Sequence, residues 1–335
     1  MTIAHLPLKP LPAARGPLSD AVNDVLRRTP GSPVPPLGTS DPFGEDMHAA
    51  LHTVYELHYH GHPQVDPGWE WDPCLLGLRA DMERLFTDAL HNGVVGGDDL
   101  DAELAGLLTP SDESTSITRF LRDEGAWWQL CEYFVHRSIY HHKEADPYAW
   151  VIPRLRGQAK ASLVAVEYDE FGGGRGERVH AQLYADLLAA AGLDPGYLHY
   201  FDAVPAPMIA LVNMMSLFGL HRIHRGALVG HFAAAEITSP LSSRNMVYAL
   251  TRHDADPACV LFYREHVEAD AVHEQIMRHD VIGDLLAREP DERAAVVFGM
   301  QTTELMEGRF SDHLRTAWNA GHSSLRDDTW HADDD

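Results

Sequence analysis

The chain has 335 residues, of which 45% are apolar and 23% charged, and its formal net charge is −24. This length suffices for a large buried core, and the composition is that of an ordinary globular protein. The acidic balance argues against a nucleic-acid partner and an anionic membrane surface, which require clustered Lys and Arg. A small-molecule partner is therefore expected.

The predicted elements in chain order are helices. A Pro- and Gly-rich stretch over residues 1–42 is expected to be an extended arm, and residues 323–335 to be an acidic, disordered tail. Between them, residues 43–322 are predicted to form a single helical domain. No alternating strand pattern occurs in it, so the fold class is all-α. Its expected helices cover residues 43–61, 72–93, 117–145, 153–171, 177–193, 203–237, 259–290 and 292–321.

The three cysteines, Cys74, Cys131 and Cys259, are scattered and form no CxxC pair. They therefore predict neither a disulfide framework nor a thiolate zinc site, and they favour a reducing cytoplasm. The N-terminus lacks the apolar core of a secretory signal, and the most apolar stretch, residues 203–220, contains prolines and Asn213. We interpret that stretch as a buried helix.

Histidines and carboxylates recur at helical spacing. In HVEADAVH, residues 266–273, the side chains of His266, Asp270 and His273 fall on one helical face, as in half of a metal site. ERVH, residues 177–180, pairs Glu177 with His180 on adjacent turns. Two carboxylate-x-x-His elements with single acids from other helices are typical of carboxylate-bridged di-iron sites in helical bundles.

Two single acids complete this pattern: Glu144 in HHKEADP and Glu236 in HFAAAEITSP. Solvated helix faces, a surface position for Glu144 and a buried ion pair for Glu236 are the alternative interpretations. Carboxylates and imidazoles without thiolates favour iron or manganese over structural zinc.

The stretch EYDEFGGGRGERVH, residues 167–180, surrounds glycines with acids. A phosphate loop is excluded, because no strand precedes the glycines and no Lys-Ser/Thr follows them. Each glycine costs about 1 kcal/mol of helix propensity relative to alanine. We therefore expect residues 171–176 to be a locally weakened segment between metal-binding groups that orders when iron binds.

KEADP, EYDEFGGGRGERVH, AAAEITSP and FYREHVEADAVHE occur in this order and together resemble the heme-oxygenase-like di-iron oxidases. The resemblance covers roughly residues 45–320. It implies a helical bundle of that fold, here with extra N-terminal helices, and two iron ions that use O2 as co-substrate with electrons from an external donor. The metal residues that it implies are Glu144, Glu170, Glu177, His180, Glu236, His266, Asp270 and His273.

Members of this family act on small amines, amino acids and fatty acids. The long form of the chain resembles members that modify free amino acids in biosynthetic clusters, so we expect an aliphatic L-amino acid, C–H cleavage, desaturation and aza-ring closure. N-oxygenation of an amino-acid amine and fatty-acid decarboxylation or desaturation are the alternatives. Heme is set aside because the hard ligands leave no room for a porphyrin.

Arg175, Arg222 and Arg225 are weak candidates for binding a substrate carboxylate. A homodimer is a further expectation. The competing hypothesis outside enzymes is a helical iron-binding carrier.

Overall fold

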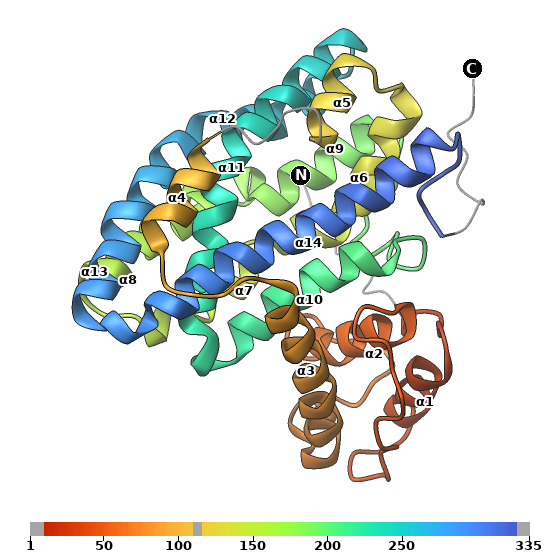
Figure 1. The fold of residues 1–335 in the computed structure, drawn as a ribbon. Helices are drawn as coiled ribbons and strands as arrows, with labels where there is room; N and C mark the ends of the chain where they lie inside the picture. The colour runs from red at the N-terminus through yellow and green to blue at the C-terminus, as the bar shows by residue number, and fades with distance from the viewer. Residues whose placement is uncertain (1–9, 110–115, 327–335) are drawn as a thin grey trace.

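A computed structural model describes residues 10–109 and 116–326, without the side chains of Glu268, Asp270 and Ala271. Helices make up the fold, and no strand occurs in these ranges, which confirms the predicted all-α class (Figure 1). The α-helices are α1 (Pro17–Leu26), α2 (Glu45–Glu56), α3 (Pro73–Gly93), α4 (Leu100–Leu108), α5 (Ile117–Asp123), α6 (Trp127–His141), α7 (Asp146–Ala149), α8 (Gly157–Glu170), α9 (His180–Ala190), α10 (Ala206–Leu220), α11 (Arg225–Arg252), α12 (Pro257–Gln275), α13 (Gly283–Arg288) and α14 (Arg293–Asn319).

The long helix α11 is central: it packs against α5, α12 and α14. Glycines allow its close approach to α14. A Cβ added at Gly230 would lie 2.0 Å from the Val296 carbonyl oxygen, and one added at Gly299 would lie 2.0 Å from the Ala227 carbonyl oxygen. No side chain fits at either position, so the small residues that the sequence places in this region permit backbone-to-backbone contact.

Three predicted helices are interrupted in the structure. The expected run over residues 117–145 divides at Gly125, which packs against the Leu121 backbone between α5 and α6. The expected helix over residues 203–237 turns by 104° after α10, because His221 is extended. After α12 the chain continues as a π-helix, Ile276–Ile282, before α13. These interruptions bend the chain around the bundle interior.

The sequence predicted an extended arm over residues 1–42, but the described part of this segment contains a helix. This helix, α1, is amphipathic; it buries Leu18, Val22, Val25 and Leu26, and it packs against α2. The Asp46 carboxylate on α2 accepts hydrogen bonds from the Leu18 and Ser19 amides at the start of α1. The Pro- and Gly-rich segments on both sides of this short helix are the reason that the sequence did not predict it.

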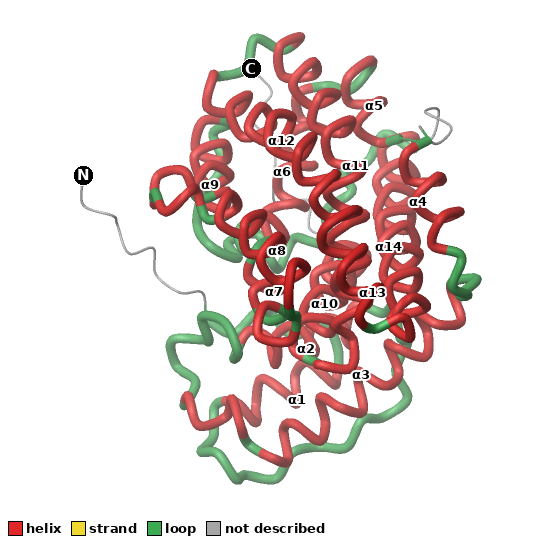
Figure 2. Tube along the Cα trace, turned by 90° about the vertical axis from the view of Figure 1, so that its left-hand side faces the viewer, coloured by secondary structure: helices red, strands yellow, loops and turns green. Residues whose placement is uncertain are grey.

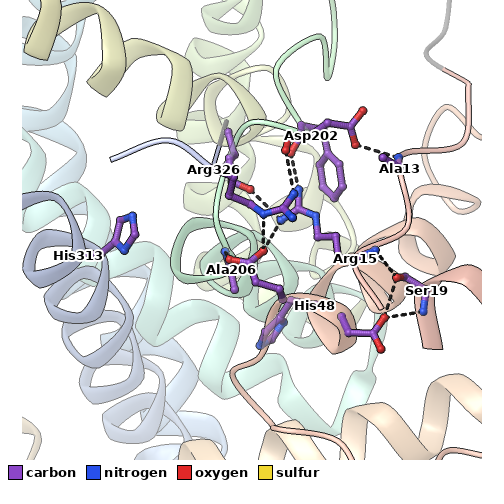
Figure 3. Close-up of polar contacts among 12 residues, drawn as sticks. Ala13, Arg15, Ser19, His48, Asp202, Ala206, His313 and Arg326 are labelled. Atoms are coloured by element: carbon purple, nitrogen blue, oxygen red, sulfur yellow. Dashed lines mark hydrogen bonds and ion pairs between the residues drawn. The ribbon is translucent and has the colours of Figure 1, made fainter. Parts of the chain in front are cut away.

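A buried arginine fastens this N-terminal segment to the body of the fold. The Arg15 guanidinium donates to Glu45 at 2.6 Å and to the carbonyls of Phe201 and Val204 at 2.6 and 2.8 Å (Figure 3). Arg326 also reaches Glu45, at 3.3 Å. Helices α1–α3 therefore form a lateral unit beside α10, held in part through this junction (Figure 1).

The first four residues of the predicted disordered tail, residues 323–326, are ordered against the body of the fold. Ser324 and Leu325 are buried, and the Ser324 amide and hydroxyl donate to the buried Glu132 carboxylate at 2.9 and 2.6 Å. The remaining nine residues of the predicted tail lie outside the described residues.

In the described ranges, no single helix is long and apolar enough to cross a membrane. Helix α10 and residues 222–252 meet that test only together, as a pair bent by 104°.

Candidate metal centre

Buried carboxylates and imidazoles from five parts of the chain meet inside the bundle. Glu144 lies in the turn after α6, Glu170 ends α8, and His180 begins α9; α11 contributes Glu236, and α12 contributes His266 and His273. Figure 2 shows these helices as neighbours. The ligand atoms form two groups, each with its atoms within 4.8 Å of one another: Glu144, Glu170, His180 and His266 in the first, and Glu170, Glu236 and His273 in the second.

In the first group the imidazoles face carboxylate oxygens. His180 Nδ1 lies 2.7 Å from Glu170 Oε2 and 3.8 Å from Glu144 Oε1. His266 Nε2 lies 3.6 Å from the same Glu144 oxygen. The Nδ1 of His266 is 2.8 Å from the Phe262 carbonyl, to which it donates, so Nε2 presents its lone pair to the group. This arrangement is typical of metal-binding histidines.

Two atoms of the first group have no hydrogen-bond partner in the described part of the chain. Glu144 Oε1 and His180 Nδ1 are both buried and unsatisfied, because the 2.7 Å contact of His180 with Glu170 lacks hydrogen-bond geometry. Leaving buried polar atoms without partners costs about 1–3 kcal/mol each. A cation between these lone pairs would remove that cost.

Glu170 joins the two groups. Its Oε2 faces His180, and its Oε1 lies 3.9 Å from His273 Nδ1. His273 Nδ1 is also 3.2 Å from Glu236 Oε2. One carboxylate thus offers one oxygen to each group, which is the geometry of a bridging ligand between two metal ions.

The electrostatics of the buried groups favour bound positive charge. Burial raises the pKa of Glu236, and the Glu170 carboxylate adds to this increase. Burial opposes protonation of His273, but its contacts with Glu236, Asp169 and Glu170 prevail and raise its pKa to about 9. For Glu144, burial is outweighed by His141 and His266, so its pKa falls. A protonated His273 therefore neutralises part of the carboxylate charge that a bound metal cation would neutralise.

The structure does not bring Glu177 into either group. The α8 helix ends at Glu170, and Gly172, Gly173 and Gly174 follow with φ of 71°, 63° and 80°, which side chains rarely adopt. The chain therefore leaves the helical path, and Glu177 is exposed. A loop, and not a continuous helix, therefore connects Glu170 to His180 and brings the two side chains together. Asp270 lies on α12, and its side chain is outside the described part of the chain.

The three arginines lie away from these ligand groups or on the surface. Arg175 and Arg222 are exposed. Arg225 pairs with Glu292 at 2.7 Å and also with Glu289, and it stands three turns of α11 before Glu236, about 16 Å along the helix. Two carboxylates neutralise its guanidinium, so we assign Arg225 a structural role.

Three further residues at the centre were not predicted. His141 donates to Glu144 Oε2 and orients it. Asp169 Oδ2 lies 3.2 Å from His273 Nε2. Glu167 is 3% exposed, and neither of its carboxylate oxygens has a hydrogen-bond partner. The HH pair before KEADP and the acids of EYDE were the only signals, and neither indicates which acid turns inward.

The model of a family described as iron-containing redox enzymes matches residues 131–308, more than half of the chain. The chain belongs to this family. The match confirms the predicted heme-oxygenase-like family, and it spans every residue of both ligand groups. No curated protein matches the chain significantly.

The residues fit the iron that this family name implies. Both groups consist of carboxylate oxygens and imidazole nitrogens, the donors that suit iron, and no thiolate belongs to either. The unsatisfied Glu144 and His180 atoms face into the first group. These buried residues would hold iron, and membership of this redox family makes the chain an oxidoreductase.

Proposed function

We propose that the protein is a non-heme di-iron oxidase that uses O2. The observation that carries this proposal is the position of Glu170, whose two oxygens face two separate histidine-bearing groups. A mononuclear site would not require a shared carboxylate between two sets of ligands. Iron bound there would supply the electrons that reduce O2 and the oxidising power for C–H cleavage.

The residues of the chain would hold and orient this centre. The Phe262 carbonyl fixes the tautomer of His266, and His141 fixes the rotamer of Glu144. Helix burial excludes bulk water from the ligand groups, whose members are all less than a tenth exposed. Fixed donors in a site of low dielectric constant need little rearrangement when a charge changes.

We propose a small aliphatic L-amino acid as the substrate, with desaturation, and ring closure at nitrogen as a further product. Desaturation takes two electrons and two protons from the substrate, whereas the reduction of O2 to two waters takes four of each. An external donor must therefore supply the other two electrons, with protons from solvent. N-oxygenation of the amine and a carrier without turnover are the competing functions.

The test begins with anaerobic loading of Fe(II), followed by O2. We expect about two irons per chain and a transient visible absorption band. His180→Ala and His273→Ala each remove a ligand of a different group, so each should reduce the iron content. Unchanged iron in both variants would overturn the proposed centre.

The substrate class is tested by the decay of the band. We expect aliphatic L-amino acids to accelerate the decay and fatty acids to leave it unchanged. Acceleration by fatty acids alone would refute the amino-acid assignment. Iron and a band without substrate turnover for any candidate would favour a carrier.

A further inference from the structure

One buried acid beside the metal centre has no hydrogen-bond partner among the residues that the structure describes. Glu167 precedes Glu170 by one turn of α8, is 3% exposed, and has both carboxylate oxygens without a hydrogen bond. A carboxyl group buried in this way is costly unless something outside the described chain satisfies it. Glu167 belongs to neither group of prospective metal ligands. Its oxygens therefore stand apart from both groups of ligand atoms in this structure.

The surroundings specify a positive partner. Glu170, Glu236, Asp146 and Glu144 all lie near enough to disfavour a negative charge on Glu167. The nearby buried ammonium of Lys143 is already engaged, because its Nζ lies 3.0 Å from Glu56 Oε2 and both side chains are 1% exposed. A ligand carboxylate would enter a region that already holds four other carboxyl groups, whereas a ligand ammonium would offset their charge and find two oxygens that have no hydrogen bond among the described residues.

Glu56 is firmly held in its own contacts. The Tyr197 hydroxyl donates to both of its oxygens, at 2.9 and 3.1 Å, and the Lys143 ammonium lies 4.3 Å from the centre of the Tyr59 ring. Lys143 is thus fixed by an ion pair and an aromatic face, and it is not positioned to neutralise Glu167. Asp146, which is only half-buried, extends the acidic environment of Glu167 toward the surface.

We propose that Glu167 binds a primary ammonium group of the substrate next to the metal centre. This inference rests on the proposed function and assigns the recognition of the substrate amino group to Glu167. It places the ammonium beside a residue that stands one helical turn before Glu170 on α8, and therefore close to the ligand groups. Simple fatty acids are excluded as substrates because they offer no cation.

The experiment measures binding by calorimetry to anaerobic Fe(II)-loaded protein, with n-hexylamine, L-lysine and n-hexanoate as probes. Wild type should bind at least one of the two amines and reject n-hexanoate. Glu167→Gln keeps the shape and removes the charge, and it should weaken amine binding about 10- to 100-fold, the range for a buried charge-assisted hydrogen bond. Glu167→Asp keeps the charge and should retain part of the affinity. The exposed Glu304→Gln on α14 is the matched control and should bind as wild type.

Iron content and thermal unfolding of each variant separate the outcomes. A folded Glu167→Gln that keeps full iron but loses the amine supports the proposal. The proposal is overturned if this variant binds the amine normally, if wild type with full iron binds neither amine, or if Glu167→Gln loses iron and the residue is thus a metal ligand. In those three cases the di-iron function still stands. Wild type without iron would instead contradict the proposed function.

Discussion

Replacing the shared carboxylate by its neutral isostere should abolish binding at both iron positions. In Glu170→Gln each metal ion loses an anionic ligand, because Oε2 serves the group with His180 and Oε1 the group with His273. His180→Ala and Glu236→Gln each remove a ligand of one group only. The three variants should therefore differ in how many irons remain, and not merely in affinity.

The magnitude follows from linkage between binding and folding. An iron present at a hundredfold excess over its Kd stabilises the folded state by about 2.7 kcal/mol. Unfolding entropy per residue, summed over 335 residues, amounts to about 0.7 kcal/mol per kelvin. Two irons should then raise the Tm of wild type by about 8 °C, and one iron by about 4 °C.

The assay is thermal unfolding under nitrogen, with and without Fe(II), together with iron analysis after desalting. His180→Ala and Glu236→Gln should show about half of the wild-type shift in Tm, and Glu170→Gln almost none. The exposed Glu304→Gln should show the full shift. If Glu170→Gln keeps one iron and half of the shift, as the single-group variants do, then Glu170 does not bridge and the geometric argument fails.

Three further predictions concern the fold and the loop. Gly230→Ala should destabilise the protein by about 3 kcal/mol, because the added Cβ would collide with the backbone of α14. Gly308→Ala has open space around the added Cβ and should stabilise the protein by about 1 kcal/mol. Denaturant unfolding measures both changes, and equal effects would contradict the close contact between α11 and α14. Burial lowers the pKa of His48 to about 3, with Nε2 donating to a carbonyl and Nδ1 accepting from Asn213, so the neutral form is the folded one. The contribution of neutral His48 to the free energy of unfolding is complete above pH 6.5 and is lost as the pH falls, by about 2 kcal/mol at pH 5. His48→Gln should therefore flatten the dependence of the free energy of unfolding on pH between pH 6.5 and 4. An unchanged dependence on pH in this variant would refute the prediction. Glu177→Gln should leave iron content at the wild-type value because Glu177 is exposed, and loss of an iron would show that the loop brings it inward.

Helix starts were the features best predicted from sequence. Asp72 before Pro73 accepts hydrogen bonds from the Cys74 and Leu75 amides at the start of α3, and Ser116 accepts from the Arg119 amide at the start of α5. These signals are local, so the sequence contains them completely. The 104° turn after α10 and the π-helix after α12 depend on packing between distant helices, which a single sequence does not display.

The candidate site also combines features that local sequence predicts with features that depend on packing between distant segments. Helical spacing predicted that His266 and His273 share one face of α12, and both side chains are buried in the structure, as is Glu236 on α11. Glu177 was assigned through the resemblance, but the glycines redirect the chain before it. Glu167 was missed because the local pattern EYDE does not show which of its acids turns into the bundle, and the structure buries Glu167 and Glu170 while Asp169 is more exposed.

The central claim is a pair of iron ions joined through Glu170. Mössbauer spectroscopy of wild type loaded with ⁵⁷Fe(II) and then oxidised by O2 tests it most directly, with iron analysis of the same sample. We expect about two irons per chain with a diamagnetic ground state, as for two ferric ions coupled through bridging ligands. One iron per chain, or two irons with the magnetic spectra of isolated ferric ions, would contradict it.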